Sequence, residues 1–496
     1  MKVELSLKIT LPTGEVGEHL LSTLERDELS LETLGLSLQE GKALLRDVQQ
    51  RLIEAQLDAF LDAQRSCTTC GEAHSNKGKH PIRLRTAFGA FEVDSPRWRR
   101  CACGADLKVT KTFSPLAALF TGHVHPELLY LETKWASLMS YGLTTALLHD
   151  VLPLDATTSA VTLRNHVLAV AKRSEATLGE ERTNFIDGCP AQWAQLPVPD
   201  GPLTVEIDGG YVRSYRKPGV FEVIVGKSIG SFSREERGGG GTPPPPPGRC
   251  FGFVQSEGGK SRRRLFEHLR TQGMTANQHV VFLSDGGDTV RNLQLYLHPQ
   301  AEHILDWFHV TMRLTVLSQL AKGLATKAQI EARRVAKKLD EDDEKYADVA
   351  REQVEPDLAS IKHYLWHGNT FRALELIRSL EFECDVPSPS KELKKFERAV
   401  SELRVYINNN QAFIPNYGEK YHQGETITTA FVESTVNQVI SKRMVKKQSM
   451  AWTPKGAHLL LQVRTRVLND ELEDLFREWH PAFRPPVPLT TAAPGI

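Results

Sequence analysis

Residues 203–213, LTVEIDGGYVR, and residues 280–287, VVFLSDGG, share the pattern that decides the fold. In each, a short apolar run of the kind found in strands buried on both faces leads to an aspartate and two glycines. A third run, ILDWFH at 304–309, also places an aspartate after apolar residues. The pattern predicts a multidomain α/β protein with carboxylates at the ends of neighbouring strands of a buried sheet.

These aspartates, Asp208 and Asp285, suit a metal site for phosphoryl transfer. Two carboxylates that neighbouring strands bring together repel each other unless a cation lies between them. Hard oxygen ligands select Mg²⁺ or Mn²⁺, and two-metal phosphoryl transfer uses such ligands. Asp-Gly is also the commonest hairpin signal, so a simple turn is the alternative. The repeated Asp-Gly-Gly ending, together with Asp306 after the third run, favours the metal site.

Length and composition indicate a large cytosolic protein. A chain of 496 residues is expected to form about three or four units. No apolar stretch approaches the roughly 20 residues of a membrane span, and the opening residues MKVELSLKIT lack a signal-peptide core. We therefore expect a cytoplasmic, nucleoid-associated protein without membrane contact. Because 61 basic residues balance 61 acidic ones, any affinity for nucleic acid must come from local basic patches.

Four clustered cysteines predict a structural zinc site. Residues 82–88 and 91–93 alternate in polarity around Gly89 and Ala90, which predicts a hairpin that brings two cysteine pairs together. In a cytosolic chain such pairs indicate metal rather than disulfides, and four thiolates form a closed tetrahedral Zn²⁺ site. His74 or His80 is an alternative to one thiolate, and four free thiols are the alternative to a metal. The expected ligands are Cys67, Cys70, Cys101 and Cys103.

Local patterns divide the chain into segments. Two capped helices separated by a short connection, near 141–152 and 161–173, resemble a DNA-reading pair, although any helical hairpin has this pattern. The expected segments are an N-terminal helical region at 1–66, a zinc ribbon at 67–115, a helix-turn-helix-like DNA-binding region at 116–176, the first part of a core at 200–312, an all-helical insertion at 313–425, and the last part of the core at 426–480.

A late helix is expected to complete the acidic site. Val432, Val436, Val439 and Ile440 form its buried stripe, and Glu433 lies at the edge of that stripe. Alone, Glu433 is a weak candidate; the two aspartates give it weight. Basic residues follow Glu433 along the chain, and further basic residues lie before the core. For each group, contact with DNA phosphates and a solvated protein surface are the two alternatives. The candidate DNA contacts are Arg99, Arg100, Arg164, Lys442, Arg443, Lys446 and Lys447, and residues 260–272 form a further basic stretch.

The order of these features resembles the ribonuclease-H-like fold of DDE transposases: strand with Asp, two strands, helix, strand with Asp, helix, and a late helix with Glu. More closely, the chain resembles bacterial insertion-sequence transposases of the ISKra group, distant relatives of the Mutator-type enzymes. The motifs that carry this resemblance are IDGGYVR at 207–213, FEVIVGK at 221–227, SDGGDTVRNL at 284–293, ILDWFHV at 304–310 and FVESTVNQVISKR at 431–443.

This resemblance implies a DNA transposase with a ribonuclease-H-like catalytic core. Asp208, Asp285 and Glu433 match the triad that holds catalytic Mg²⁺ (or Mn²⁺), and Asp306 with His309 matches an Asp-x-x-His element. Such enzymes cut and join double-stranded DNA at element ends and target, and two ends imply a homodimer or larger assembly on DNA. A structural role for His309 stays open. The alternatives for the whole protein are a catalytically silent DNA-binding regulator derived from a transposase and a stand-alone ribonuclease-H-like nuclease.

Overall fold

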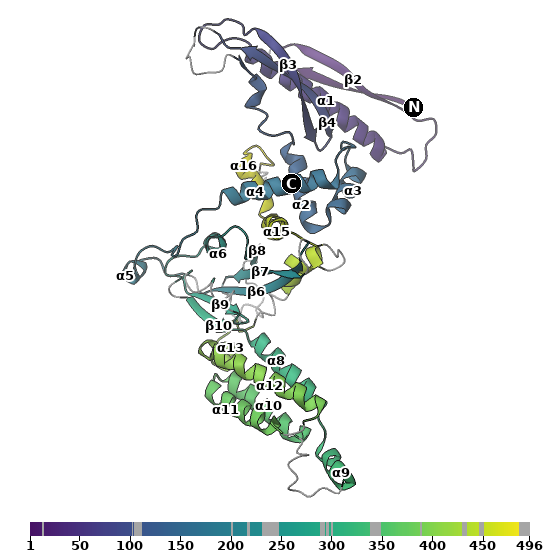
Figure 1. Ribbon diagram of the computed structural model, residues 1–496. Coiled ribbons are helices and arrows are strands. Elements are labelled where there is room, and N and C mark those ends of the chain that lie inside the picture. Colours follow the sequence, from purple (N-terminus) through teal and green to yellow (C-terminus); the bar gives the residue numbers. More distant parts are fainter. Residues whose placement is uncertain are drawn as a thin grey trace, which may run out of the picture. The chain divides into compact units, whose positions relative to one another are not determined.

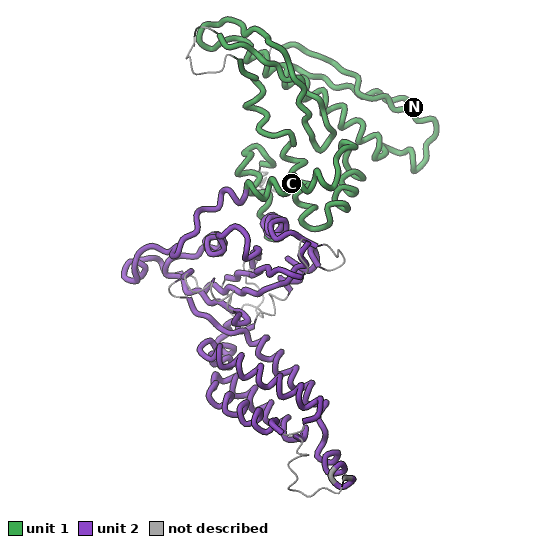
Figure 2. Tube along the Cα trace, in the orientation of Figure 1, with its two compact units in different colours: residues 1–173, 466–496 green, residues 174–465 purple. Residues whose placement is uncertain are grey.

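The structure is a computed structural model that describes residues 1–11, 14–101, 103, 112–199, 202–215, 219–230, 248–287, 293, 297–298, 301–337, 349–386, 389–428, 434–445 and 451–485. It is a mixed α/β protein that divides into two compact units, residues 1–173 with 466–496 and residues 174–465 (Figure 2). Within the described ranges, no helix has both the length and the apolar character needed to cross a membrane.

The first unit begins with a β-hairpin, and the expectation of an N-terminal helical region at 1–66 is wrong for this part. Strand β1 (Lys2–Thr10) pairs antiparallel with β2 (Val16–Glu25). Val3, Leu5 and Leu7 alternate with polar residues, and this period of two fits a strand with one half-buried face. Helix α1 (Leu38–Ala63) begins only afterwards, where Ser37 and Glu40 form a capping box.

Helix α1 packs on a three-stranded antiparallel sheet of β3 (Asn76–Thr86), β4 (Gly89–Arg99) and β5 (Thr112–Phe113). The hairpin between β3 and β4 is confirmed, but its turn is residues 87–88, and Gly89 already pairs with Thr86. Ile53 of α1 is buried in the shared apolar core. The neighbouring face of α1 remains open, with Leu45 exposed to 45% and Leu52 to 38%.

The rest of the first unit is mainly helical. It contains η2 (Pro115–Ala117), α2 (Pro126–Leu138), α3 (Tyr141–Val151), most of α4 (Ala160–Ala176) and α16 (Leu472–Trp479). The two helices predicted for the helix-turn-helix-like region are present as α3 and α4. The connection at 152–159 is longer than the turn of about 3–4 residues in that motif, so the DNA-reading role of this pair stays a prediction.

The second unit is built around a five-stranded sheet with the order β10-β9-β6-β7-β8 (Figure 1). Strands β6, β7 and β8 form an antiparallel meander, whereas β9 and β10 run parallel to β6. One face is covered by α6 (Ser261–Thr271) through Leu265 and Leu269. The strands are β6 (Leu203–Arg213), β7 (Val220–Ile229), β8 (Arg249–Val254), β9 (Val280–Ser284) and β10 (Ala301–Leu305), and a short helix α5 (Pro190–Trp193) precedes them.

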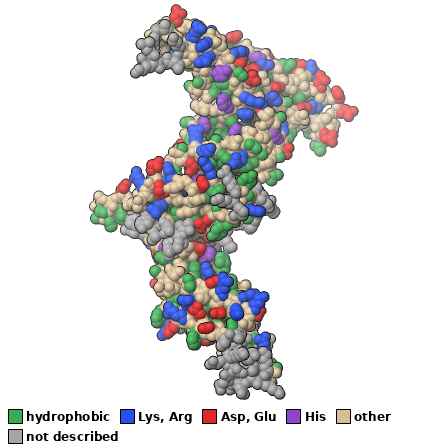
Figure 3. Space-filling model, in the orientation of Figure 1, with side chains coloured by type: hydrophobic (Ala, Val, Ile, Leu, Met, Phe, Trp, Pro, Cys, Tyr) green, Lys and Arg blue, Asp and Glu red, His purple; other side chains and the backbone are tan. Residues whose placement is uncertain are grey.

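A helical bundle continues the core beyond β10. Val281, Leu283 and Ile304 of the sheet share one buried cluster with the bundle helices. On the face shown in Figure 3, the bundle carries basic and acidic side chains interspersed. The described residues of 313–425 are helical where they are regular: α8 (Trp307–Ala321), α9 (Lys327–Lys337), α10 (Arg351–Trp366), α11 (Thr370–Cys384), α12 (Lys391–Asn410), η5 (Gln411–Phe413) and α13 (Tyr417–His422). The π-helical segment η6 (Asn437–Val445) and α15 (Pro454–Leu468) follow.

Candidate functional site

Three aspartates lie at one level across three neighbouring strands. Glu206 of β6 pairs with Leu283 of β9, so Asp208 and Asp285, each two residues further on, reach the same level. Ser284 pairs with Leu305 of β10, which brings Asp306 to that level as well. Parallel strands thus bring together side chains that are far apart in the sequence.

Asp208 lies inside β6, not at its end as the Asp-Gly-Gly pattern suggested. The strand continues to Arg213 because it stays paired with β7 after β9 has ended. The Gly209 N–H donates to Asp208 Oδ1 over 2.7 Å. Burial raises the pKa of Asp208 above its ordinary value; this N–H and His309 oppose the rise, and the nearby charges of Asp285 and Asp306 add to it. The site therefore concentrates negative charge in partly buried surroundings.

A fourth carboxylate, Glu206, was not among the predicted site residues. It is two residues before Asp208 on the same face of β6, and its side chain is fully buried. Neither of its carboxylate oxygens has a hydrogen-bond partner among the described residues. Burial raises the pKa of Glu206 to about 8, and Asp306 adds to the rise while Lys227 opposes it. The alternation in Val-Glu-Ile-Asp was the signal that could have identified it.

Asp306 and His309 are both at the start of helix α8. Asp306 is fully buried and caps the helix by accepting a 2.9 Å hydrogen bond from the Phe308 N–H. His309 Nε2 lies 3.6 Å from Asp306 Oδ2, and the His309 side chain is 22% exposed. The histidine therefore reaches the acidic cluster from its solvent side, and the cap explains part of the role of Asp306.

The late helix packs directly beside Asp208. A Cβ atom on Gly210 would lie 2.4 Å from Ile440 Cδ1 and 3.6 Å from Val436 Cγ1, so a larger residue here would require the Ile440 side chain to move. Val439 and Ile440 are buried, as the predicted stripe requires. Glu433 itself lies outside the described residues. The segment that follows it is π-helical rather than α-helical, and the Arg464 side chain donates to its Val439 and Gln438 carbonyls.

The donor set fits a hard divalent cation. Carboxylate oxygens are what Mg²⁺ and Mn²⁺ prefer. The buried oxygens of Glu206 have no hydrogen-bond partner among the described residues, and its raised pKa keeps it largely protonated at neutral pH when no cation lies beside it. The aspartates do not form a closed cage by themselves. Among the described residues, no three acids or histidines have ligand atoms within 4.8 Å of one another. Further ligands would have to come from Glu433, water or substrate.

Four cysteines do form a closed site that could bind zinc. The sulfur atoms of Cys67, Cys70, Cys101 and Cys103 all lie within 4.8 Å of one another. The Cys67–Cys103 and Cys70–Cys101 sulfur distances are 3.6 and 3.1 Å, against ~3.8 Å between ligands of a tetrahedral Zn–thiolate site. Backbone N–H groups lower the pKa of Cys67 and Cys101, whereas the hydrogen bonds with Cys101 raise the pKa of Cys70 and Cys103, so that deprotonation of all four thiols requires a bound cation.

His74 supports this site without joining it. Its Nδ1 lies 3.1 Å from the Arg99 carbonyl oxygen, and its ring packs edge-on against Phe113 with centroids 5.0 Å apart. It does not belong to the four-sulfur group. The alternative in which a histidine replaces one thiolate is therefore not supported for His74.

The predicted DNA contacts divide into exposed and buried residues. Arg99, Arg100, Arg164 and Lys442 are exposed. Arg443 is fully buried, and its guanidinium lies 5.1 Å from the centre of the Trp452 ring, which does not fit a surface phosphate contact. The apolar stripe of its helix carries it inward, an effect that a count of charges does not detect. Lys446 and Lys447 lie outside the described residues.

The basic stretch at 260–272 is largely neutralised. Arg264 makes a two-pronged contact with Glu175, at 2.6 and 2.7 Å, and Lys260 pairs with Glu180 at 3.2 Å. Glu267 pairs with both Arg263 and Arg270. Some of these acids lie about 80 positions upstream in the sequence. The residues around the stretch alone therefore overstate its net positive charge.

The similarity of this chain to known proteins is low. No protein-family model matches the sequence, and no curated protein matches it. One solved structure that it matches is a Drosophila P element transposase strand transfer complex, with a TM-score of 0.31 and 11% identity, over 72% of this chain and 98% of that chain. A TM-score this low carries no argument about the fold or the function of this chain.

Proposed function

We propose that this protein is a DNA transposase that binds insertion-sequence ends and performs metal-dependent strand cleavage and strand transfer by a DDE mechanism. The observation that carries the proposal is the common level of Asp208, Asp285 and Asp306 across β6, β9 and β10. Phosphoryl transfer needs carboxylates on a rigid frame, and a sheet supplies that frame. The five motifs that resemble ISKra-group transposases include all three aspartates.

We further propose that the second unit is a ribonuclease-H-like core interrupted by the helical bundle. The support is its strand order, an antiparallel β6-β7-β8 meander extended by parallel β9 and β10. The close packing of Ile440 on Gly210 supports a late helix beside the acids, as the proposal requires for Glu433. In this proposal the bundle from α8 to α13 is an insertion between β10 and η6.

The side chains have separate tasks in the proposed reaction. Asp208, Asp285 and Glu433 would hold Mg²⁺ or Mn²⁺. The bound metal would lower the pKa of the attacking water or 3′-hydroxyl and would stabilise the leaving oxygen. Asp306 fixes the start of α8 and lowers the freedom of His309. His309, partly exposed on the solvent side, is in position to orient a phosphate or a ligand.

DNA recognition is assigned to exposed basic residues. Arg99 is the last residue of β4 and Arg100 follows it, next to the cysteine site. Arg164 lies on α4, and Lys442 lies on η6. We assign phosphate contacts to these four and to Lys446 and Lys447, but not to the buried Arg443. A homodimer or larger assembly on DNA follows from the need to act on two element ends.

The test is a strand-cleavage assay with Mg²⁺ on DNA that carries the sequences flanking this gene. Wild type is compared with Asp285→Ala, Asp208→Asn and the control Asp187→Ala, which removes an exposed carboxylate outside the cluster. We expect nicked and joined products from wild type and Asp187→Ala, and a loss of at least about a hundredfold in the two site variants.

The products also separate the other candidate functions. DNA binding by folded wild type without any nicking would contradict the enzyme and favour a catalytically silent regulator. Nicking without joined products would favour a stand-alone nuclease. Cleavage that survives Asp208→Asn would show that the acids at this level are not catalytic.

A further inference from the structure

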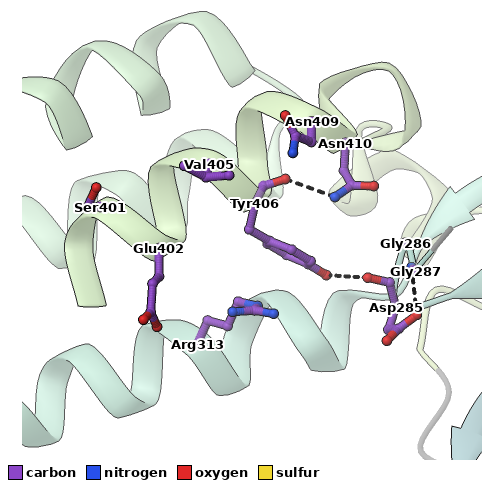
Figure 4. Close-up of a pocket in the computed structure, with 10 residues that line it drawn as sticks. All are labelled: Asp285, Gly286, Gly287, Arg313, Ser401, Glu402, Val405, Tyr406, Asn409 and Asn410. Carbon is purple, nitrogen blue, oxygen red and sulfur yellow. Dashed lines mark hydrogen bonds between the residues drawn. The ribbon is translucent and has the colours of Figure 1, made fainter. Parts of the chain in front are cut away.

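A polar pocket lies next to Asp285, on the side of the helical bundle (Figure 4). Its volume is about 830 Å³, within the range of roughly 300–1,000 Å³ typical of small-ligand sites. Among the described residues that line it, only Val405 is aliphatic. The remaining lining residues are Asp285, Gly286, Gly287, Arg313, Ser401, Glu402, Tyr406, Asn409 and Asn410. Such a lining does not suit an apolar molecule, because polar groups would lose water without gaining partners.

One wall of the pocket is a cation stacked on an aromatic ring. The Arg313 guanidinium of α8 lies 4.0 Å from the centre of the Tyr406 ring of α12. The Tyr406 hydroxyl donates to the Asp285 carbonyl over 3.0 Å, which holds the ring at the strand end. No carboxylate among the described residues forms an ion pair with Arg313, and the nearby Glu402 accepts instead from Arg398 at 3.1 Å. The guanidinium thus lies over the ring with no ion-pair partner among the described residues, although the Asp285 and Glu402 carboxylates line the same pocket.

Two amide side chains follow Tyr406 at the end of α12. Asn410 is only 4% exposed, and its Nδ2 donates to the Tyr406 carbonyl over 2.9 Å. Its Oδ1 has no hydrogen-bond partner among the described residues, but it is buried against Gly286 and is not open to a ligand. A Cβ on Gly286, which has a φ of +81°, would lie 2.4 Å from that oxygen. The exposed amide of Asn409 is also at the pocket.

The ligand must therefore combine three properties. It needs a flat π face to lie against the guanidinium, an edge of donors and acceptors for the exposed Asn409 amide, and a negative charge near Arg313. A nucleotide has all three. We propose that this pocket receives one unpaired nucleotide of the DNA strand, with its base stacked on the Arg313–Tyr406 pair. This inference rests on the proposed function, since the strand that enters the acidic site is what would deliver the nucleotide.

The test measures binding in magnesium-free buffer, so that it does not depend on cleavage. The probes are a fluorescent oligothymidylate and an abasic strand of the same length. We expect Arg313→Ala to weaken oligothymidylate binding by roughly 5- to 150-fold, the range for loss of one base stack, with little effect on the abasic strand. Arg313→Lys should behave in the same way, because an ammonium keeps the charge but not the flat face. The control is Arg372→Ala, which removes an exposed side chain of α11 that pairs with Glu375.

Four outcomes would overturn the inference. Equal loss on both strands, or rescue by Arg313→Lys, would make Arg313 a phosphate contact only. No difference between Arg313→Ala and Arg372→Ala would exclude the pocket. Binding of free thymidine monophosphate that depends on Arg313, with oligothymidylate binding unchanged, would make it a mononucleotide site. Base-dependent binding in a protein that never cleaves DNA would leave the pocket intact and contradict only the proposed catalysis.

Discussion

The Tyr406 hydroxyl donates a hydrogen bond to the backbone carbonyl of Asp285 over 3.0 Å, across 121 residues of sequence. Burial raises the pKa of Tyr406, so its hydroxyl stays protonated and remains a donor over the physiological range. This contact joins α12 to the end of β9, and it fixes the backbone that carries one of the proposed metal ligands.

Tyr406→Phe should weaken catalysis more than folding. The ring and its stack with Arg313 remain, but one carbonyl loses its partner, at a cost of about 1 kcal/mol in unfolding free energy. Because Asp285 would then be less restrained, we expect metal-dependent cleavage to fall by about tenfold or more. Urea unfolding and cleavage rates measure the two effects. A stability loss of the expected size with unchanged cleavage would show that this bond serves only the fold.

The close contact between Gly210 and Ile440 predicts that a destabilising substitution at one position can be compensated by a smaller side chain at the other. In Gly210→Ala the new methyl group meets Ile440 Cδ1 at 2.4 Å, so the buried Ile440 side chain must move, which should destabilise the second unit by about 1 kcal/mol, and by up to about 3 kcal/mol if η6 moves with it. Adding Ile440→Val removes that carbon atom and should restore much of the stability and the cleavage. Gly142→Ala, whose Cβ would meet nothing within 4 Å, is the control. If the double variant is no better than Gly210→Ala alone, the steric explanation is wrong.

Short-range pattern predicted much of the fold, because periodicity is a local property. The strands that lead to Asp208 and Asp285 and the stripe of Val439 and Ile440 follow directly from it. The N-terminal strand was missed although Val3, Leu5 and Leu7 alternate, since the helical pattern of α1 was extended too far toward the N-terminus. Local pattern therefore identifies elements better than it locates their boundaries.

The site itself depends on pairings that a sequence does not contain. The common level of Asp208 and Asp285 requires the register of β6 on β9, and the Tyr406 contact requires the bundle to fold back on the sheet. Arg443 was expected at the surface because it is charged. It is buried because it lies on the buried face of its helix, and a sequence does not show which face that is.

The cysteine cluster predicts one zinc ion per chain. Wild type should contain it by elemental mass spectrometry, and Cys70→Ser should lose it because four thiolates are needed to close the site. Duplex DNA binding should weaken in parallel, since Arg99 lies beside the cluster. Cys189→Ser changes an exposed cysteine outside the cluster and should keep the metal. Wild type without zinc, yet with a ribbon that resists proteolysis, would contradict the prediction.

Glu175 predicts how the stability of the second unit depends on pH. Its carboxylate contacts the Arg264 guanidinium at 2.6 and 2.7 Å and lies 3.4 Å from His458 Nε2, and its side chain is 22% exposed. Although burial opposes ionisation, His458 and Arg264 lower its pKa from 4.5 to about 2. Because the folded value is the lower one, the stabilisation is complete above about pH 4.5 and is lost as the pH falls toward 2.

Glu175→Gln should therefore lower the unfolding free energy by about 2–3 kcal/mol at pH 7, with a difference from wild type that shrinks progressively between pH 4.5 and 2. Urea unfolding of both proteins at a series of pH values measures this difference. Glu180→Gln removes the 86%-exposed partner of Lys260 and should change stability little at any pH. A difference between Glu175→Gln and wild type that stays constant from pH 7 to pH 3 would mean that packing, and not the ion pair, accounts for the loss.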